Sequence, residues 1–192
     1  MTEILFYIDI GKSHILDLQA YDHLLFIVTL CAVFDIHQWK QIMVMVTAFT
    51  IGHSVSLALS VLNVFYINNA LVETLIPVTI VLAAGSNILR RNNPMPSQFL
   101  SNYILAGLFG LIHGLGFSIY LKQLLGDASS LLLPLLGFNV GLEVGQLLIV
   151  LVYFAIVLAV DRFGFLKRNV RILAISIVTM MVGIKMIIEV WV

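Results

Sequence analysis

Six apolar stretches, most of them long enough to cross a membrane as a helix, divide this chain of 192 residues. A helix needs about 20 consecutive apolar residues to cross the hydrocarbon of a bilayer. The stretches cover about residues 20–35, 41–62, 69–89, 100–124, 131–160 and 171–191. This pattern predicts an all-α membrane protein, a bundle of about six transmembrane helices.

The composition agrees with lipid as the solvent. Hydrophobic residues make up 61% of the chain and charged residues only 10%, whereas soluble domains carry about 25% charged residues. The formal net charge is zero, so nothing favours bulk attraction to nucleic acid. The length suits one transmembrane domain over residues 1–192. Residues 1–18 are only mildly apolar, and we expect them to form an interfacial or re-entrant segment.

The basic residues predict the orientation of the six spans. Both termini and two loops share one side, which carries only Lys12 and Lys122. The opposite side carries seven basic residues: Lys40, Arg90, Arg91, Arg162, Lys167, Arg168 and Arg171. Basic residues accumulate in cytoplasmic loops. We therefore expect a multi-pass protein of a bacterial inner (plasma) membrane with both termini outside.

Ionisable side chains lie at similar depths within these spans. Each costs roughly 2.5–3.5 kcal/mol at the centre of a membrane helix, so such residues persist when they pair, bind a ligand or line a wet cavity. His53 and His113 lie about 18 and 20 Å from the inner ends of their spans, at 1.5 Å per residue. Asp22 and His23 open the first span, and Glu143 lies about 18 Å from the outer end of the fifth. We expect a shared site in the outer half of the bundle.

Polar residues accompany these groups on the same helical faces. Asn139, Glu143 and Gln146 are spaced i, i+4, i+7 and form one stripe. Thr50 and Ser54 share a face with His53, and Ser54 could hydrogen-bond a ligand. Glu73 is expected to guard the entrance or to pair with Lys185. Lys185 itself is spaced i, i+4 from Glu189, which predicts a simple ion pair.

Glycines line two of the helical faces. Gly137, Gly141 and Gly145 form a ridge beside Glu143, and Gly107, Gly110 and Gly114 accompany His113. Small residues at this spacing let another helix approach closely. The ridges serve packing within the chain or docking of a second copy or another membrane protein.

Imidazole and carboxylate groups together indicate a divalent transition metal ion such as nickel, cobalt or zinc. The metal-ligand candidates are His23, His53, His113, Asp22 and Glu143. In a regular helix, adjacent residues such as Asp22 and His23 would not both reach one ion. One of these two is therefore expected to orient a ligating histidine.

Several motifs resemble the second branch of the HupE/UreJ family of small membrane proteins. They are Gly11-Lys-Ser-His-Ile-Leu16, Tyr21-Asp-His-Leu-Leu-Phe26, Phe49-Thr-Ile-Gly-His-Ser54, Ile112-His-Gly-Leu-Gly-Phe117 and Phe138-Asn-Val-Gly-Leu-Glu-Val-Gly-Gln146. The resemblance implies a hydrogenase or urease accessory protein or a nickel/cobalt permease. Carried over by position, it adds His14 to the metal candidates.

Three functions follow from these observations. The first is a nickel/cobalt-type permease, in which the ion is met by His14, Glu73 or Asp22. It is then held by the other three histidines of the candidate set together with Glu143 or Asp22. The second is an intramembrane zinc hydrolase acting on a lipid or membrane peptide, in which Glu143 or Asp22 activates water and Ser54 assists. The third is a metal-sensing or accessory membrane subunit without catalysis.

Overall fold

The computed structural model describes residues 3–64, 68–92, 97–125, 131–162 and 167–192. Within these ranges it contains helices and no strand, which confirms the all-α prediction. The elements are α1 (Glu3–Leu16), α2 (Asp22–Cys31), a short 3₁₀ helix η1 (Ile36–Gln38), α3 (Trp39–Val61), α4 (Asn69–Arg90), α5 (Ser97–Leu125), α6 (Leu132–Arg162) and α7 (Arg168–Trp191). The bounds of α3 to α7 lie close to the apolar stretches of the sequence, α2 covers only part of the stretch 20–35, and α1 lies in the segment expected to be interfacial or re-entrant.

Four of the described segments are long and apolar enough to cross a membrane. They are Ile36–Val61, Asn69–Arg90, Leu132–Arg162 and Arg168–Trp191. Two further apolar helical segments, Asp22–Cys31 and Asn102–Ser118, are shorter. The chain is thus a membrane-embedded helical protein, while the number of six spans and the placement of the termini outside remain predictions.

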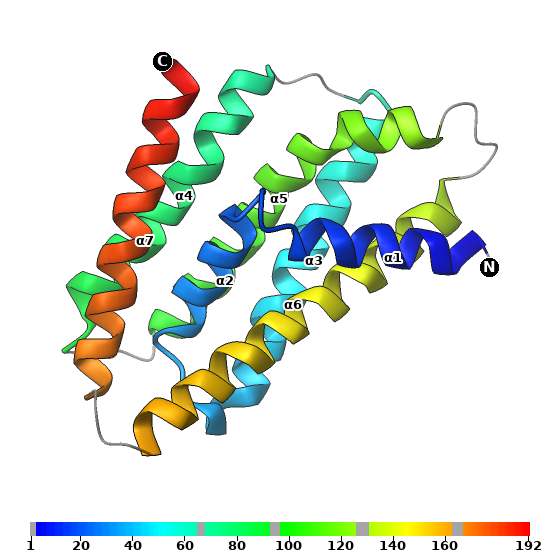
Figure 1. Cartoon of the computed structure of the whole chain (residues 1–192). Helices are drawn as coiled ribbons and strands as arrows, with labels where there is room; N and C mark the ends of the chain where they lie inside the picture. The colour runs from blue at the N-terminus through cyan, green and yellow to red at the C-terminus, as the bar shows by residue number, and fades with distance from the viewer. Residues whose placement is uncertain (1–2, 65–67, 93–96, 126–130, 163–166) are drawn as a thin grey trace.

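The helices pack in pairs that are distant in sequence (Figure 1). α3 packs along α5, α4 along α7, and α1 along α6. The short helix α2 lies in the middle of the bundle and contacts α4, α6 and α7. The buried apolar core includes Phe26, Phe49, Phe109 and Phe138, contributed by four different helices. This arrangement brings the end of α1 and the start of α2 close to the middle parts of α3 and α5.

Two glycines set the helix distances on which the functional region depends. A Cβ at Gly114 of α5 would strike the backbone carbonyl of His53 in α3, and one at Gly11 of α1 would strike the carbonyl of Phe138 in α6. Backbone cannot move aside as a flexible side chain does, so only glycine permits these approaches. The glycines therefore hold α3 against α5 and α1 against α6.

The glycine ridges of the sequence are occupied within the chain. The ridge at Gly137, Gly141 and Gly145 lies against α1, and Gly110 and Gly114 lie against α3. The glycine faces are therefore already packed against helices of the same chain. The expected docking of another copy or a membrane partner on these faces is accordingly not supported.

Candidate metal centre

A row of histidines from four helices crosses the middle of the bundle. The ring centroids of His23 (α2) and His113 (α5) are 4.1 Å apart. His14 (α1) lies 4.8 Å from His23 and 6.1 Å from His53 (α3). His23, His53 and His113 are at most 3% exposed. Four of the expected candidates therefore gather in one buried cluster, called here the histidine row.

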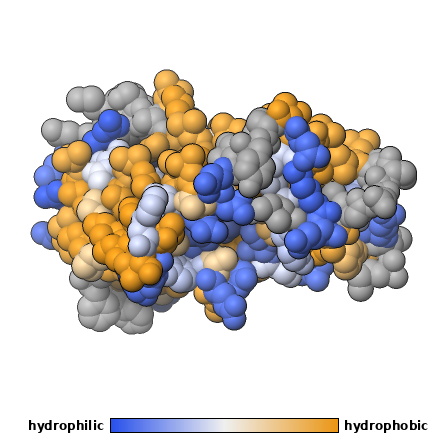
Figure 2. Space-filling view, turned by 90° about the horizontal axis from the view of Figure 1, so that it is seen from above, coloured by the Kyte–Doolittle hydropathy of each residue, from blue (hydrophilic) through white to orange (hydrophobic). Residues whose placement is uncertain are grey.

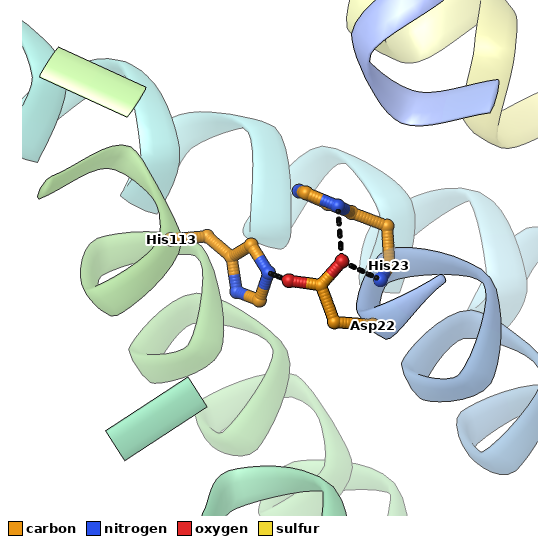
Figure 3. A group of neighbouring side chains, drawn as sticks. All are labelled: Asp22, His23 and His113. Carbon is orange, nitrogen blue, oxygen red and sulfur yellow. Dashed lines mark hydrogen bonds and ion pairs between the residues drawn. The ribbon is translucent and has the colours of Figure 1, made fainter. Parts of the chain in front are cut away.

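Asp22 joins two members of the row through its carboxylate (Figure 3). Its Oδ2 lies 2.7 Å from Nε2 of His113, and its Oδ1 lies 3.1 Å from Nδ1 of His23. The backbone N–H of His23 donates to the same Oδ1 at 2.9 Å. The carboxylate thus bridges α2 and α5 and fixes the orientation of both rings.

The adjacent residues Asp22 and His23 do converge, contrary to the expectation from a regular helix. Ligand atoms of Asp22, His23 and His113 all lie within 4.8 Å of one another, close enough for one metal ion. The cause is the position of Asp22 as the first residue of α2. At a helix end the side chain can fold back over the first turn, as it also does in capping.

Imidazole nitrogens in the row lack hydrogen-bond partners. The unpaired buried atoms are Nε2 of His14, Nε2 of His23, Nδ1 of His113 and both ring nitrogens of His53. A buried polar atom without a partner costs about 1–3 kcal/mol. Nitrogen atoms left free in this way, beside a carboxylate, are the donor set that a divalent transition metal requires. The residues present therefore fit a metal ion.

Aromatic rings enclose the row. The His14 ring packs on Phe117 at 4.0 Å, the His113 ring on Phe109 at 4.0 Å, and the His53 ring on Phe138 at 5.7 Å. The aromatic packing restricts the rotamers of the imidazoles. The free nitrogens have almost no solvent-accessible surface, so they are not simply exposed to bulk water.

Two cavities with acidic linings flank the row. The first, of about 420 Å³, is lined by Asp22, Glu73 and Glu189 among others. The second, of about 520 Å³, is lined by His14, Asp9 and Asp17 among others. Both lie at the end of the bundle where α2 and α4 begin and α5 and α7 end. Seen from above, hydrophilic residues gather in the middle and on the right of the view (Figure 2).

The roles of the polar residues around these cavities agree only in part with those predicted from the sequence. Glu73 lines the first cavity, and its expected role at an entrance stays a prediction. Lys185 pairs with Glu189 at 3.2 Å, which confirms the predicted i, i+4 ion pair. The role of Glu189 as a cavity residue was not foreseen, nor were those of Asp9 and Asp17, because exposed carboxylates near helix ends carry no distinguishing pattern.

Glu143 lies apart from the histidine row. Its Oε1 accepts a hydrogen bond from Oγ1 of Thr47 at 3.1 Å, and Gln146 Oε1 accepts one from Oγ1 of Thr50 at 2.9 Å. Among the described residues, the possible metal group contains Asp22 and two histidines but not Glu143. Ser54 and Asn139 line a separate groove with Glu143.

The fold and the site together define an all-helical membrane protein with a buried aspartate–histidine group able to bind a metal ion. The chain belongs to the HupE/UreJ family, since the family described as "HupE / UreJ protein" matches residues 1–191. Membership associates the chain with nickel or cobalt handling, as an accessory or transport protein. Neither the comparison with curated proteins nor that with solved structures finds a match.

Proposed function

We propose that this protein is a permease for a divalent transition metal ion, nickel or cobalt, in the bacterial plasma membrane. The observation that carries the proposal is the set of buried, unpaired imidazole nitrogens in the histidine row beside Asp22. A helix-packing role alone would favour histidines whose nitrogens are hydrogen-bonded. Here Asp22 engages one nitrogen each of His23 and His113 and leaves the other free.

The hydrogen bonds to Asp22 prepare the two imidazoles for a metal. Ligating histidines commonly donate their second ring N–H to a carboxylate, which fixes the tautomer and raises the basicity of the ligating nitrogen. Under this arrangement Nε2 of His23 and Nδ1 of His113 are available to the ion. His14 and His53 supply further nitrogen ligands, and Asp22 itself remains within reach.

The acidic cavities support an entry route for cations. Carboxylates lining a concave surface raise the local concentration of cations and their rate of arrival. Asp22 also lines the cavity of Glu73 and Glu189, and His14 also lines the cavity of Asp9 and Asp17. With both termini outside, as the loop charges favour, these cavities open to the outer side and receive the ion there.

The test combines metal binding with transport. Purified protein is analysed for bound nickel or cobalt and then reconstituted into liposomes for uptake measurements. His23→Ala and His113→Ala are expected to lose bound metal and uptake together. His37→Ala is the matched control, because His37 is the exposed fifth histidine on η1, outside the row. Uptake that persists in both row variants would contradict the proposal.

The gathering of the row into a single cluster favours a second candidate, a fixed zinc site of an intramembrane hydrolase. Three ligands and a water in the fourth position would suit such a site. The two candidates differ in a direct observable. A permease moves its ion across the liposome membrane, whereas a hydrolase retains zinc without net transport and cleaves a lipid or membrane peptide.

A further inference from the structure

Glu143 occupies an environment that the metal centre does not explain. It lies about 16 Å along α6 and faces Thr47, about 12 Å along α3, at 1.5 Å per residue. Both helices are apolar enough to cross the membrane. Among the described residues, no Lys, Arg or His forms an ion pair with Glu143, and its Oε1 accepts a hydrogen bond from the hydroxyl of Thr47 at 3.1 Å. A charged carboxylate without a compensating cation at such depth in the membrane costs free energy.

Glu143 lines a small groove between α3 and α6. The groove has a volume of about 260 Å³, and five of its lining residues carry side-chain oxygens. These residues are Thr47, Thr50, Ser54, Asn139 and Glu143. The rest of the lining is aliphatic. Since a water molecule takes about 30 Å³ in the liquid, the groove has room for an ion and several waters.

One of these oxygens is a free acceptor. Oδ1 of Asn139 is buried and has no hydrogen-bond partner. Asn139 and Glu143 are one helical turn apart on α6, so both project to the same side. A free amide oxygen beside a carboxylate would repel an anion and attract a cation.

Two hydrogen bonds hold the walls of the groove together. Thr47 donates to Glu143, and Thr50 donates to Oε1 of Gln146, which is 1% exposed. The Ser54 hydroxyl donates to the Thr50 carbonyl at 2.6 Å and keeps its lone pairs for another partner. The hydroxyl and carboxylate oxygens are thereby positioned by α3 and α6 before any ligand arrives.

We propose that this groove binds one monovalent alkali cation, Na⁺, at a site separate from the metal centre. The reason is the chemistry of its polar lining: carboxylate, hydroxyl and amide oxygens, which suit hard cations, in contrast to the imidazoles of the histidine row. The single carboxylate balances one positive charge. A divalent ion would leave a net charge at membrane depth. The site rests on its own residues and does not depend on the proposed permease function.

The experiment measures equilibrium binding of ²²Na⁺ to the purified full chain in detergent. Ionic strength is held constant with choline chloride. The wild-type protein is expected to show one saturable site. Glu143→Gln keeps the shape of the side chain and should lower the affinity by about 10- to 100-fold, as for loss of a charged ligand. Glu3→Gln, at an exposed carboxylate outside both acidic cavities, is the matched control and should bind as the wild type does.

Further variants separate this site from the histidine row. Thr47→Val should also weaken Na⁺ binding, and it serves as the second test if Glu143→Gln does not fold. His23→Ala should bind Na⁺ normally even though it loses the transition metal. Absence of saturable Na⁺ binding by the wild type would overturn the proposal. Na⁺ binding by Glu143→Gln with the affinity of the wild type would also overturn it. If the groove instead holds only a protonated Glu143, the wild-type protein will bind no Na⁺ at this site.

Discussion

Asp22 is the residue on which the orientation of the metal centre depends. Replacement by asparagine keeps its size but gives one oxygen and one amide in place of two acceptor oxygens. The amide cannot accept from both His23 and His113, so one ring is released. We expect Asp22→Asn to lower the affinity for nickel or cobalt by about 10- to 100-fold, the usual effect of losing such a partner. Isothermal titration with the metal measures this change.

The control for this substitution is Glu3→Gln. Glu3 is an exposed carboxylate in the first turn of α1, outside both acidic cavities. It should bind metal with wild-type affinity. An Asp22→Asn protein that binds as tightly as Glu3→Gln would show that Asp22 neither ligates the ion nor orients the histidines.

At the scale of single residues, the sequence predicted which side chains matter better than it predicted how they meet. Depth in the membrane grouped His23, His53 and His113 correctly, because rise per residue is nearly constant along a helix. Depth does not fix which way a side chain points around the axis. Glu143 shares the depth range but faces Thr47 on α3. Thr47 itself was missed, since a threonine in an apolar helix is ordinary.

At the scale of helices, the close contact between α1 and α6 can be tested at Gly11. An added Cβ there strikes the backbone of Phe138, so α1 must shift away from α6. We expect Gly11→Ala to destabilise the protein by about 1–3 kcal/mol, as overpacking usually does, and to weaken metal binding by displacing His14. Unfolding in denaturing detergent and metal titration follow the two effects.

Gly85 in α4 is the matched position for this comparison. A Cβ at Gly85 meets only Cε of Met180, at 3.5 Å, which is an ordinary contact. Gly85→Ala should therefore stabilise α4 by up to about 1 kcal/mol through helix propensity. Equal stability changes at the two glycines would contradict the role assigned to Gly11.

The helices illustrate what apolar periodicity can and cannot predict. It located α3, α4, α6 and α7 closely, since each is a long apolar run bounded by polar residues. It did not predict that α1 would be a helix packed along α6. That contact depends on Gly11 and Gly141 meeting backbone of the facing helix, a relation between distant residues that no local pattern contains.

At the scale of the whole molecule, the predicted orientation can be tested by cysteine labelling. Cys31 is fully buried and should not react with a maleimide. In a Cys31→Ser background, Asn69→Cys at the start of α4 should react with an impermeant maleimide in intact cells. Lys167→Cys, before α7, should react only after permeabilisation, because basic loops face the cytoplasm. The reverse pattern would place both termini inside.

The packing of α1 against α6 also bears on how the protein is made. α1 leaves the ribosome well before its partner α6 (Leu132–Arg162), because the helices α2 to α5 separate the two in the chain. His14 can join His23, His53 and His113 only after α6 has been synthesised and α1 has docked onto it. The full set of imidazoles therefore forms only after α6 has left the ribosome, so a shorter nascent chain is spared from trapping metal ions in an unfinished site.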